Sequence, residues 1–181
     1  MSNLIFVIRH GEKPPPAGCV LGVDRRGRPD ETALSVKGWQ RAGALVGFFG
    51  WPGEKGIAVP ALLYAPRPVA KDPSRRPGLT VEPLAARLGL QLSMDYAKDE
   101  QDALWRELQR VEGTVLVSWE HKAIVGLANL IMGGAGKTPQ QWPDDRYDVV
   151  WRFERGPDGA WAFSQIAQRL LPGDAATVIG D

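Results

Sequence analysis

The chain has 181 residues, which suits one domain better than two, and we expect residues 1–181 to form a single domain. Hydrophobic residues make up 44% of the sequence and charged residues 24%, a composition typical of globular proteins and unlike that of disordered chains. The 22 Lys and Arg residues nearly balance the 21 Asp and Glu residues, for a formal net charge of +1. No overall field therefore favours nucleic acid or an anionic membrane as a partner.

The cysteine count and the first apolar run indicate the compartment. A single cysteine, Cys19, excludes an internal disulfide and a four-cysteine zinc site, and it fits a reducing environment. The apolar run at residues 4–8 is too short for a signal-peptide core or a membrane span. We therefore expect a cytoplasmic protein that does not enter a membrane. We interpret Cys19 as a free surface thiol, because the sequence places no histidine partner close to it.

The first part of the chain alternates apolar runs with amphipathic segments. Residues 4–8 are apolar and rich in β-formers, which predicts a strand buried on both faces. A long loop rich in Gly, Pro and charge follows up to residue 33. From Ser35, a suitable N-cap, apolar residues at helical spacing predict a helix that stops before Gly50. Residues 61–65 form the next short apolar run.

The alternation continues through the middle of the chain. Residues 66–77 form a second irregular segment, which carries four basic residues, and a helical stripe after it ends at Gly89. Residues 90–94 indicate a further strand, and the next helix ends at Gly113. Residues 114–119 form the second fully apolar strand, and the helix behind it stops at Gly133. Such alternation predicts a mostly parallel central sheet with helices on both faces.

The last part of the chain has a different pattern. Large apolar residues alternate with other residues from Tyr147 to Phe153 and again around residues 161–163, with a glycine-containing turn at 156–159. This pattern predicts an antiparallel hairpin at the edge of the sheet. The expected fold class is therefore α/β, with a mostly parallel central sheet flanked by helices on both faces and an antiparallel C-terminal hairpin.

Both histidines of the chain follow directly after the two most apolar strands. His10 comes after residues 4–8, and His121 comes after residues 114–119. Ligands of open parallel sheets bind at the carboxyl ends of the strands, so we expect the two histidines to share a site. Arg9 adds a permanent cation with several donors, and Gly11 is expected to leave room for a ligand to approach the backbone. This local charge suits a phosphate group.

Several motifs in the same order resemble the histidine phosphatase superfamily, whose fold is phosphoglycerate mutase-like. The motifs are Arg-His-Gly-Glu-Lys at 9–13, Leu-Ser-Val-Lys-Gly at 34–38, Leu-Leu-Tyr-Ala-Pro at 62–66, Thr-Val-Glu-Pro-Leu-Ala at 80–85 and Val-Leu-Val-Ser-Trp-Glu-His at 115–121. The resemblance covers most of the chain, from residue 4 to about residue 131.

The resemblance implies hydrolysis of a phosphate monoester, in a small molecule or a phosphoprotein, through a phosphohistidine on His10. It implies no metal and no organic cofactor, and it implies that a phosphate or sulfate anion can occupy the site. The residues implied to bind the phosphoryl group are Arg9, Gly11, Arg76 and His121. His10 must be neutral to attack, and the arginines beside it are expected to lower its pKa. Its other ring nitrogen should donate to a fixed acceptor, for which we expect a backbone carbonyl.

The second arginine is identified by its distance from Thr80. In the family this arginine stands four residues before the threonine, and that position here is Arg76. Arg67 and Arg75 are the alternatives on the same loop. The loop is longer than is usual in the family, so it is expected to shape substrate specificity.

The acid that protonates the leaving group has three candidates. Family spacing places it within residues 95–100, where we choose Asp99. Glu120 beside the second histidine and Glu12 beside the first are the alternatives. Here the second histidine lies in a Trp-Glu-His-Lys context where much of the family has Ser-His-Gly, so this chain represents an unusual branch.

Three other functions compete with phosphatase activity. A mutase would need a second phosphate-binding surface, for which a chain of this length gives little room. A protein that binds a phosphorylated ligand without turnover is consistent with the altered second motif. A zinc site built from His10, His121 and a carboxylate is disfavoured, because an arginine beside a ligand histidine repels the cation.

Overall fold

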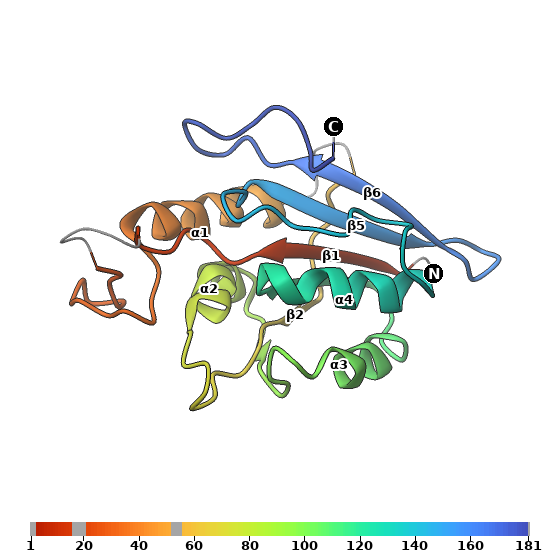
Figure 1. The fold of residues 1–181 in the computed structure, drawn as a ribbon, viewed down its shortest axis with the longest axis horizontal. Coiled ribbons are helices and arrows are strands. Elements are labelled where there is room, and N and C mark those ends of the chain that lie inside the picture. The colour runs from red at the N-terminus through yellow and green to blue at the C-terminus, as the bar shows by residue number, and fades with distance from the viewer. Residues whose placement is uncertain (1–2, 16–20, 52–55, 181) are drawn as a thin grey trace.

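The computed structural model describes residues 3–15, 21–51 and 56–180 (Figure 1). Cys19 lies outside the described residues, so our interpretation of it stays a prediction. The elements in chain order are β1 (Leu4–Arg9), α1 (Val36–Phe49), β2 (Leu62–Tyr64), α2 (Arg76–Leu88), β3 (Leu92–Ser93), α3 (Gln101–Leu108), β4 (Thr114–Trp119), α4 (His121–Met132), β5 (Val149–Arg155) and β6 (Trp161–Ala167).

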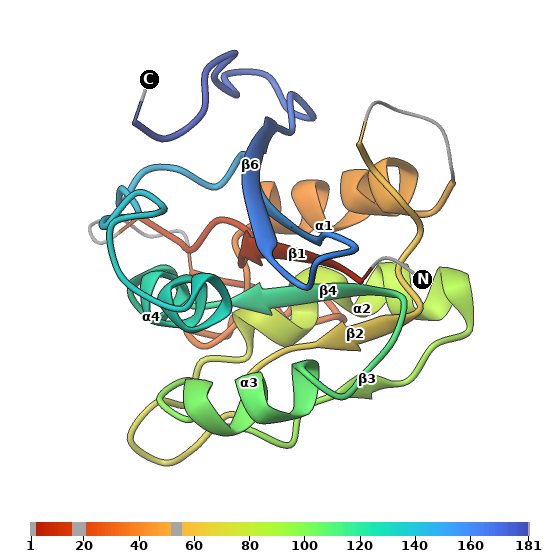
Figure 2. The ribbon, with the colours of Figure 1, turned by 90° about the vertical axis from the view of Figure 1, so that its right-hand side faces the viewer.

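The strands form one mixed sheet in the order β3-β2-β4-β1-β5-β6. The strands β3, β2, β4 and β1 run parallel to one another, whereas β5 is antiparallel to β1 and β6 is antiparallel to β5. Figure 2 shows β6 rising from the edge of the sheet, with the chain end beyond it. The predicted sheet with an antiparallel C-terminal hairpin is confirmed.

Alternate residues of β1 belong to two different hydrophobic cores. Ile5 and Val7 pack in the core that contains the apolar faces of α3 and α4. Phe6 and Ile8 pack in the other core, with the apolar faces of α1 and α2. Because strand side chains alternate between faces, these helices cover opposite sides of the sheet. All six residues of β1 are buried, as its unbroken apolar sequence predicts.

Capping residues set the ends of the helices close to where the sequence predicts them. The Ser35 hydroxyl accepts a hydrogen bond from the Gly38 amide at 3.0 Å, which caps the start of α1. Helices α2 and α4 end at Gly89 and Gly133, both with a φ of 67°, a conformation that glycine adopts without strain.

Three boundaries differ from the predictions. Helix α2 begins at Arg76, inside the segment that we expected to be irregular, because Pro77 occupies the first turn, where its missing amide costs no hydrogen bond. Helix α3 ends at Leu108, several residues before Gly113. Strand β3 has only two residues, because only Leu92 and Ser93 pair with β2.

The carboxyl ends of β1 and β4 lie side by side, since Arg9 pairs with Trp119 in the parallel register. The two histidines follow these two positions and are therefore brought to the same edge of the sheet. Among the described residues, no helix is both long enough and apolar enough to cross a membrane.

Candidate active site

His10 extends beyond the end of β1, and its side chain is buried, with 4% of the residue exposed. Its backbone amide donates to the carbonyl oxygen of Trp119 at 3.1 Å, which fixes the residue beside the end of β4. Its ring atom Nδ1 lies 2.7 Å from the carbonyl oxygen of Gly11. A carbonyl oxygen can only accept, so Nδ1 carries the proton and Nε2 has a free lone pair. The acceptor is a backbone carbonyl, as we expected.

The charges around His10 favour its neutral form. Burial, together with the smaller effects of Arg9, Arg76 and His121, lowers the pKa of His10 to about 3 against the opposing hydrogen bond to Gly11. The ring is therefore neutral at neutral pH. Arg9, Arg76 and His121 are thus close enough to act on the His10 ring.

Arg9 is fully buried and holds a loop from the C-terminal part of the chain. Its Nη1 atom donates to three backbone carbonyl oxygens, those of Pro143, Asp144 and Arg146, at 3.1, 2.7 and 3.0 Å. Its Nη2 atom donates to the Tyr147 hydroxyl at 3.2 Å, and its Cζ atom lies 3.8 Å from the centre of that ring. Within the described part of the chain, the buried Nε atom has no hydrogen-bond partner. Arg9 thus anchors the loop and keeps one unused donor.

His121 is the first residue of α4, and each of its ring nitrogens lies near a carboxylate. Nε2 lies 2.6 Å from Oδ1 of Asp144. Nδ1 lies 2.8 Å from Oε1 of Glu120 but is buried without an aligned hydrogen bond. The His121 ring is therefore held between two carboxylates.

Glu120 caps α4 and is ionised. Its carboxylate accepts from the Lys122 amide at 3.2 Å. Burial alone would raise the pKa of Glu120, but the neighbouring His121 and the Lys122 amide hold it at about 2. Glu120 therefore needs a proton from a neighbouring group, such as His121, before it can act as an acid.

Arg76 opens α2 and reaches toward the long N-terminal loop. Its Nε atom donates to the carbonyl oxygen of Ala33 at 3.0 Å, and its Nη2 atom donates to that of Glu31 at 2.5 Å. The Thr80 hydroxyl donates to the Arg76 carbonyl at 2.7 Å and accepts from the Gly11 amide at 2.8 Å. Thr80 therefore ties the first turns of α2 to the loop that carries His10.

The alternatives to Arg76 bind elsewhere. Arg67 forms an exposed ion pair with Glu100 at 3.2 Å. Arg75 forms an ion pair with Asp30 on the protein surface. The charge of Arg76 is among the main effects that lower the pKa of His10. The choice of Arg76 as the second arginine stays a prediction.

Gly11 differs from our expectation. A Cβ atom on Gly11 would lie 2.9 Å from the carbonyl oxygen of Gly38, so the missing side chain allows close contact with α1 and opens no space for a ligand. Its amide is bonded to Thr80 and its carbonyl oxygen to His10. Gly11 therefore orients the His10 ring, and both its backbone groups are already hydrogen-bonded.

Two of the candidate acids are paired with basic side chains. Asp99 is exposed and accepts from Lys71, which lowers the pKa of Asp99. Glu12 is buried, and both its carboxylate oxygens accept from Arg41, at 2.7 to 3.1 Å. Arg41 also pairs with Asp174 at 2.7 Å. Glu12 thus belongs to a buried ion-pair cluster, which disfavours it as the acid.

Sequence reasoning did not find the loop at residues 143–147, which supplies both Asp144 and Tyr147. We placed Tyr147 in the hairpin, but β5 begins only at Val149. The contacts of this loop with Arg9 join residues 134 to 138 positions apart. The only signal in the sequence is the polar run Pro-Asp-Asp-Arg-Tyr, and it does not belong to any of the motifs identified in the sequence analysis.

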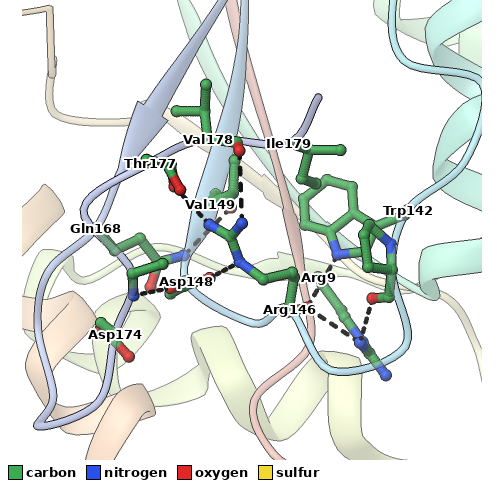
Figure 3. A network of polar contacts seen from close by, with 12 residues as sticks. Arg9, Trp142, Arg146, Asp148, Val149, Gln168, Asp174, Thr177, Val178 and Ile179 are labelled. Atoms are coloured by element: carbon green, nitrogen blue, oxygen red, sulfur yellow. Dashed lines mark hydrogen bonds and ion pairs between the residues drawn. The ribbon is translucent and has the colours of Figure 1, made fainter. Parts of the chain in front are cut away.

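The segment near the C-terminus is hydrogen-bonded to this loop through Arg146, as Figure 3 shows. The Arg146 carbonyl accepts from Arg9 and also from Nε1 of Trp142, at 2.9 Å. The Arg146 side chain donates to Asp148 at 2.7 Å and to the carbonyl oxygen of Thr177 at 2.6 Å. Arg146 therefore connects the end of the chain with the guanidinium of Arg9.

Two cavities flank the site, and Asp144 lines both. One, of about 480 Å³, lies between the loop after His10 and the loop at 144–148, and Lys13, Lys37 and Tyr147 line it. The other, of about 420 Å³, lies over α4 and includes His121 and Lys122. Within residues 3–15, 21–51 and 56–180, no group of three or more His, Cys, Asp or Glu side chains is placed to hold a metal ion.

Solved structures share this fold over most of the chain. A phosphoserine phosphatase mutant from Entamoeba histolytica in complex with phosphoserine aligns with 93% of this chain and 99% of its own, at 11% identity and a TM-score of 0.59. The protein histidine phosphatase SixA complexed with tungstate aligns with 91% and 97%, at 17% identity and 0.56. Phosphoglycerate mutase from Plasmodium falciparum aligns with 98% of each chain, at 10% identity and 0.55.

The likeness is one of structure. No family model matches the sequence, and no curated protein matches it at a significant level. The chain has a phosphoglycerate mutase-like fold, as predicted.

Proposed function

We propose that this protein hydrolyses a phosphate monoester through a phosphohistidine on His10. The observation that carries the proposal is the state of this ring, which is buried, neutral and held by Gly11 with Nε2 unprotonated. A nucleophilic imidazole needs these three properties together. A histidine that only supported the fold would have no need of three cationic side chains around it.

The chemistry follows from the geometry in two displacements. In the first, the Nε2 lone pair forms a bond to phosphorus as the bond from phosphorus to the ester oxygen breaks, and the alcohol leaves with a proton from an acid. In the second, water attacks phosphorus, the bond to Nε2 breaks, and inorganic phosphate is released. The Gly11 carbonyl keeps Nδ1–H in place throughout, so the ring needs no tautomeric change.

One unpaired buried donor suits the charge of the transferred group. Among the described residues, Nε of Arg9 is buried and makes no hydrogen bond, although buried polar groups are nearly always paired. A phosphoryl oxygen would satisfy it. Fixed donors of this kind stabilise the charge on the equatorial oxygens of the transition state. Arg76 adds a second cation near His10.

The solved structures of similar fold support this proposal through their printed names. Two of the three are phosphatases, and one of these holds tungstate, a tetrahedral oxyanion like phosphate. For the leaving-group acid we retain Asp99 and Glu120, and we favour Glu120 because it contacts His121. We further propose that residues 1–181 act as a single domain in the cytoplasm, on a small phosphate ester or a phosphoprotein.

The test is hydrolysis of p-nitrophenyl phosphate and a panel of alkyl phosphates, with a metal chelator present. We expect turnover by the wild type, inhibition by vanadate, and loss of turnover in His10→Ala. Arg75→Ala is the matched control, because Arg75 is an exposed arginine one position from Arg76. Acid-labile phosphate trapped on the wild type but not on His10→Ala would identify the intermediate.

Other outcomes assign other functions. Vanadate binding without turnover of any ester would indicate a protein that binds phosphorylated ligands. Activity that chelation removes and zinc restores would replace the phosphohistidine mechanism with a metal site. Transfer of phosphate to a second alcohol in place of water would indicate a mutase.

A further inference from the structure

Tyr147 lies beside the His10 ring and against the Arg9 guanidinium. Its ring centre is 6.1 Å from that of His10, and the two rings are inclined at 56°. The Arg9 guanidinium covers the ring face, with Cζ 3.8 Å from the centre. Tyr147 also lines the cavity of about 480 Å³ beside the loop after His10. The residue is therefore half-buried between the candidate nucleophile and a cavity that a leaving group could occupy.

The hydrogen bonds of the hydroxyl leave its own proton unused. The oxygen accepts from Nη2 of Arg9 at 3.2 Å, so the hydroxyl proton must point away from that donor. Among residues 3–15, 21–51 and 56–180, the hydroxyl donates no hydrogen bond to another protein atom. A half-buried hydroxyl with a free proton, beside a site for an anion, is arranged to donate.

The electrostatic surroundings agree with this geometry. Burial raises the pKa of Tyr147 against the opposing charges of Arg9 and Arg76, so the hydroxyl is protonated at neutral pH. In turn, Tyr147 acts on the charges of both Arg9 and Arg76. The hydroxyl therefore lies within electrostatic range of the two arginines proposed to hold the phosphoryl group.

We propose that the Tyr147 hydroxyl donates a hydrogen bond to a phosphoryl oxygen while the group is transferred to His10. This inference rests on the proposed function and adds one catalytic residue to it. A neutral donor at this place stabilises the equatorial oxygens without adding a positive charge beside the nucleophile. The ring also shields the Arg9 guanidinium from water, which strengthens the attraction of Arg9 for the same oxygens.

The test compares Tyr147→Phe with Tyr64→Phe. Tyr147→Phe keeps the ring over Arg9 and removes only the hydroxyl. Tyr64→Phe removes a hydroxyl that donates to Glu107 at 2.7 Å, away from the histidines. We expect Tyr147→Phe to lower kcat about 100-fold, as loss of one preorganised donor does, and to weaken vanadate binding by a similar factor. Tyr64→Phe should change neither value by more than about twofold.

A spectroscopic readout separates donation to the anion from support of Arg9. Inorganic phosphate should perturb the near-ultraviolet tyrosine band of the wild type, because the hydroxyl gains an anionic acceptor. Tyr147→Phe should lose this perturbation, while Tyr64→Phe keeps it. A tyrosine that only held Arg9 would give no such signal, and that result would overturn the inference.

The turnover and vanadate-binding measurements also distinguish a failure of this inference from a failure of the proposed function. If the wild type hydrolyses esters and Tyr147→Phe keeps its kcat and vanadate affinity, the inference is wrong and the proposed function stands. If the wild type binds vanadate without turnover, a weaker affinity in Tyr147→Phe still supports the donor. If the wild type neither turns over esters nor binds vanadate, both proposals are wrong.

Discussion

Nδ1 of His10 donates to the carbonyl oxygen of Gly11, the very next residue, at 2.7 Å. The bond makes the direction of the His10 ring a property of the local backbone, independent of any distant side chain. Gly11 can take this position because it has no Cβ atom, which would collide with the backbone of Gly38 in α1. The glycine of the first motif thus serves packing and, through packing, the tautomer of the histidine.

His10 should make folding stability depend on pH. Its pKa is about 3 in the folded protein and about 6.5 in the unfolded chain, so between these values the unfolded state binds the extra proton. The free energy of unfolding should therefore fall as the pH drops from about 6.5 toward 3, by at most about 1.4 kcal/mol per pH unit from this group. Denaturant titrations of the wild type and of His10→Ala should show a shallower dependence in the variant. Equal slopes in the two proteins would show that the ring is not buried in its neutral form.

Arg76→Ala should reduce kcat/KM strongly. Loss of one preorganised donor to the phosphoryl group costs about 3 kcal/mol of transition-state stabilisation, or about 100-fold or more. Arg67→Ala and Arg75→Ala should cost much less, since both side chains form exposed ion pairs away from His10. Steady-state kinetics with one ester ranks the three variants, and a larger loss in Arg67→Ala would reverse our assignment of the second arginine.

Thr80→Val should destabilise the protein and disturb His10. Thr80 is fully buried, and its hydroxyl is the acceptor for the Gly11 amide. Valine has the same shape but leaves that amide unpaired, at a cost of about 1 to 3 kcal/mol. Thr80→Ser keeps the hydroxyl and should recover most of the loss in chemical denaturation. If Thr80→Ser destabilises the protein as much as Thr80→Val does, the lost methyl group matters as much as the lost hydrogen bond.

Glu120→Gln should affect poor leaving groups most. An acid matters when the departing alkoxide is a strong base, so hydrolysis of an alkyl phosphate should fall far more than hydrolysis of p-nitrophenyl phosphate. Asp99→Asn, an exposed carboxylate bound to Lys71, should leave the ratio of the two rates unchanged. A changed ratio in Asp99→Asn alone would return the role to Asp99.

Residues at the ends of apolar strands were predictable from the sequence. Unbroken apolar runs mark strands that are buried on both faces, and the rule for parallel sheets then places His10 and His121 at one edge. Arg76 was predictable through its spacing to Thr80, because one helical turn joins them. These signals are local, so a single sequence contains them.

The loop at 143–147 was not predictable, because its position depends on a contact with a residue more than 130 positions away. Its polar residues read equally well as a solvated turn, and the alternation that begins at Tyr147 favours a strand. The start of α2 was missed for a different reason, since Pro77 reads as a helix breaker unless its place in the first turn is known.

Because β1 lies inside the sheet, it can be paired on both sides only after the chain up to β5 has been synthesised. This strand is synthesised first, yet its two neighbours pair Leu4 with Thr114 on one side and with Glu154 on the other. Until the ribosome has made those segments, an almost wholly apolar strand has nothing to pair with, and folding must close loops of more than 100 residues. A nascent chain released before β5 would expose one side of β1 to aggregation and would hold Arg9 without the carbonyls that fix it. Activity should therefore appear only late in translation, after the C-terminal hairpin has emerged.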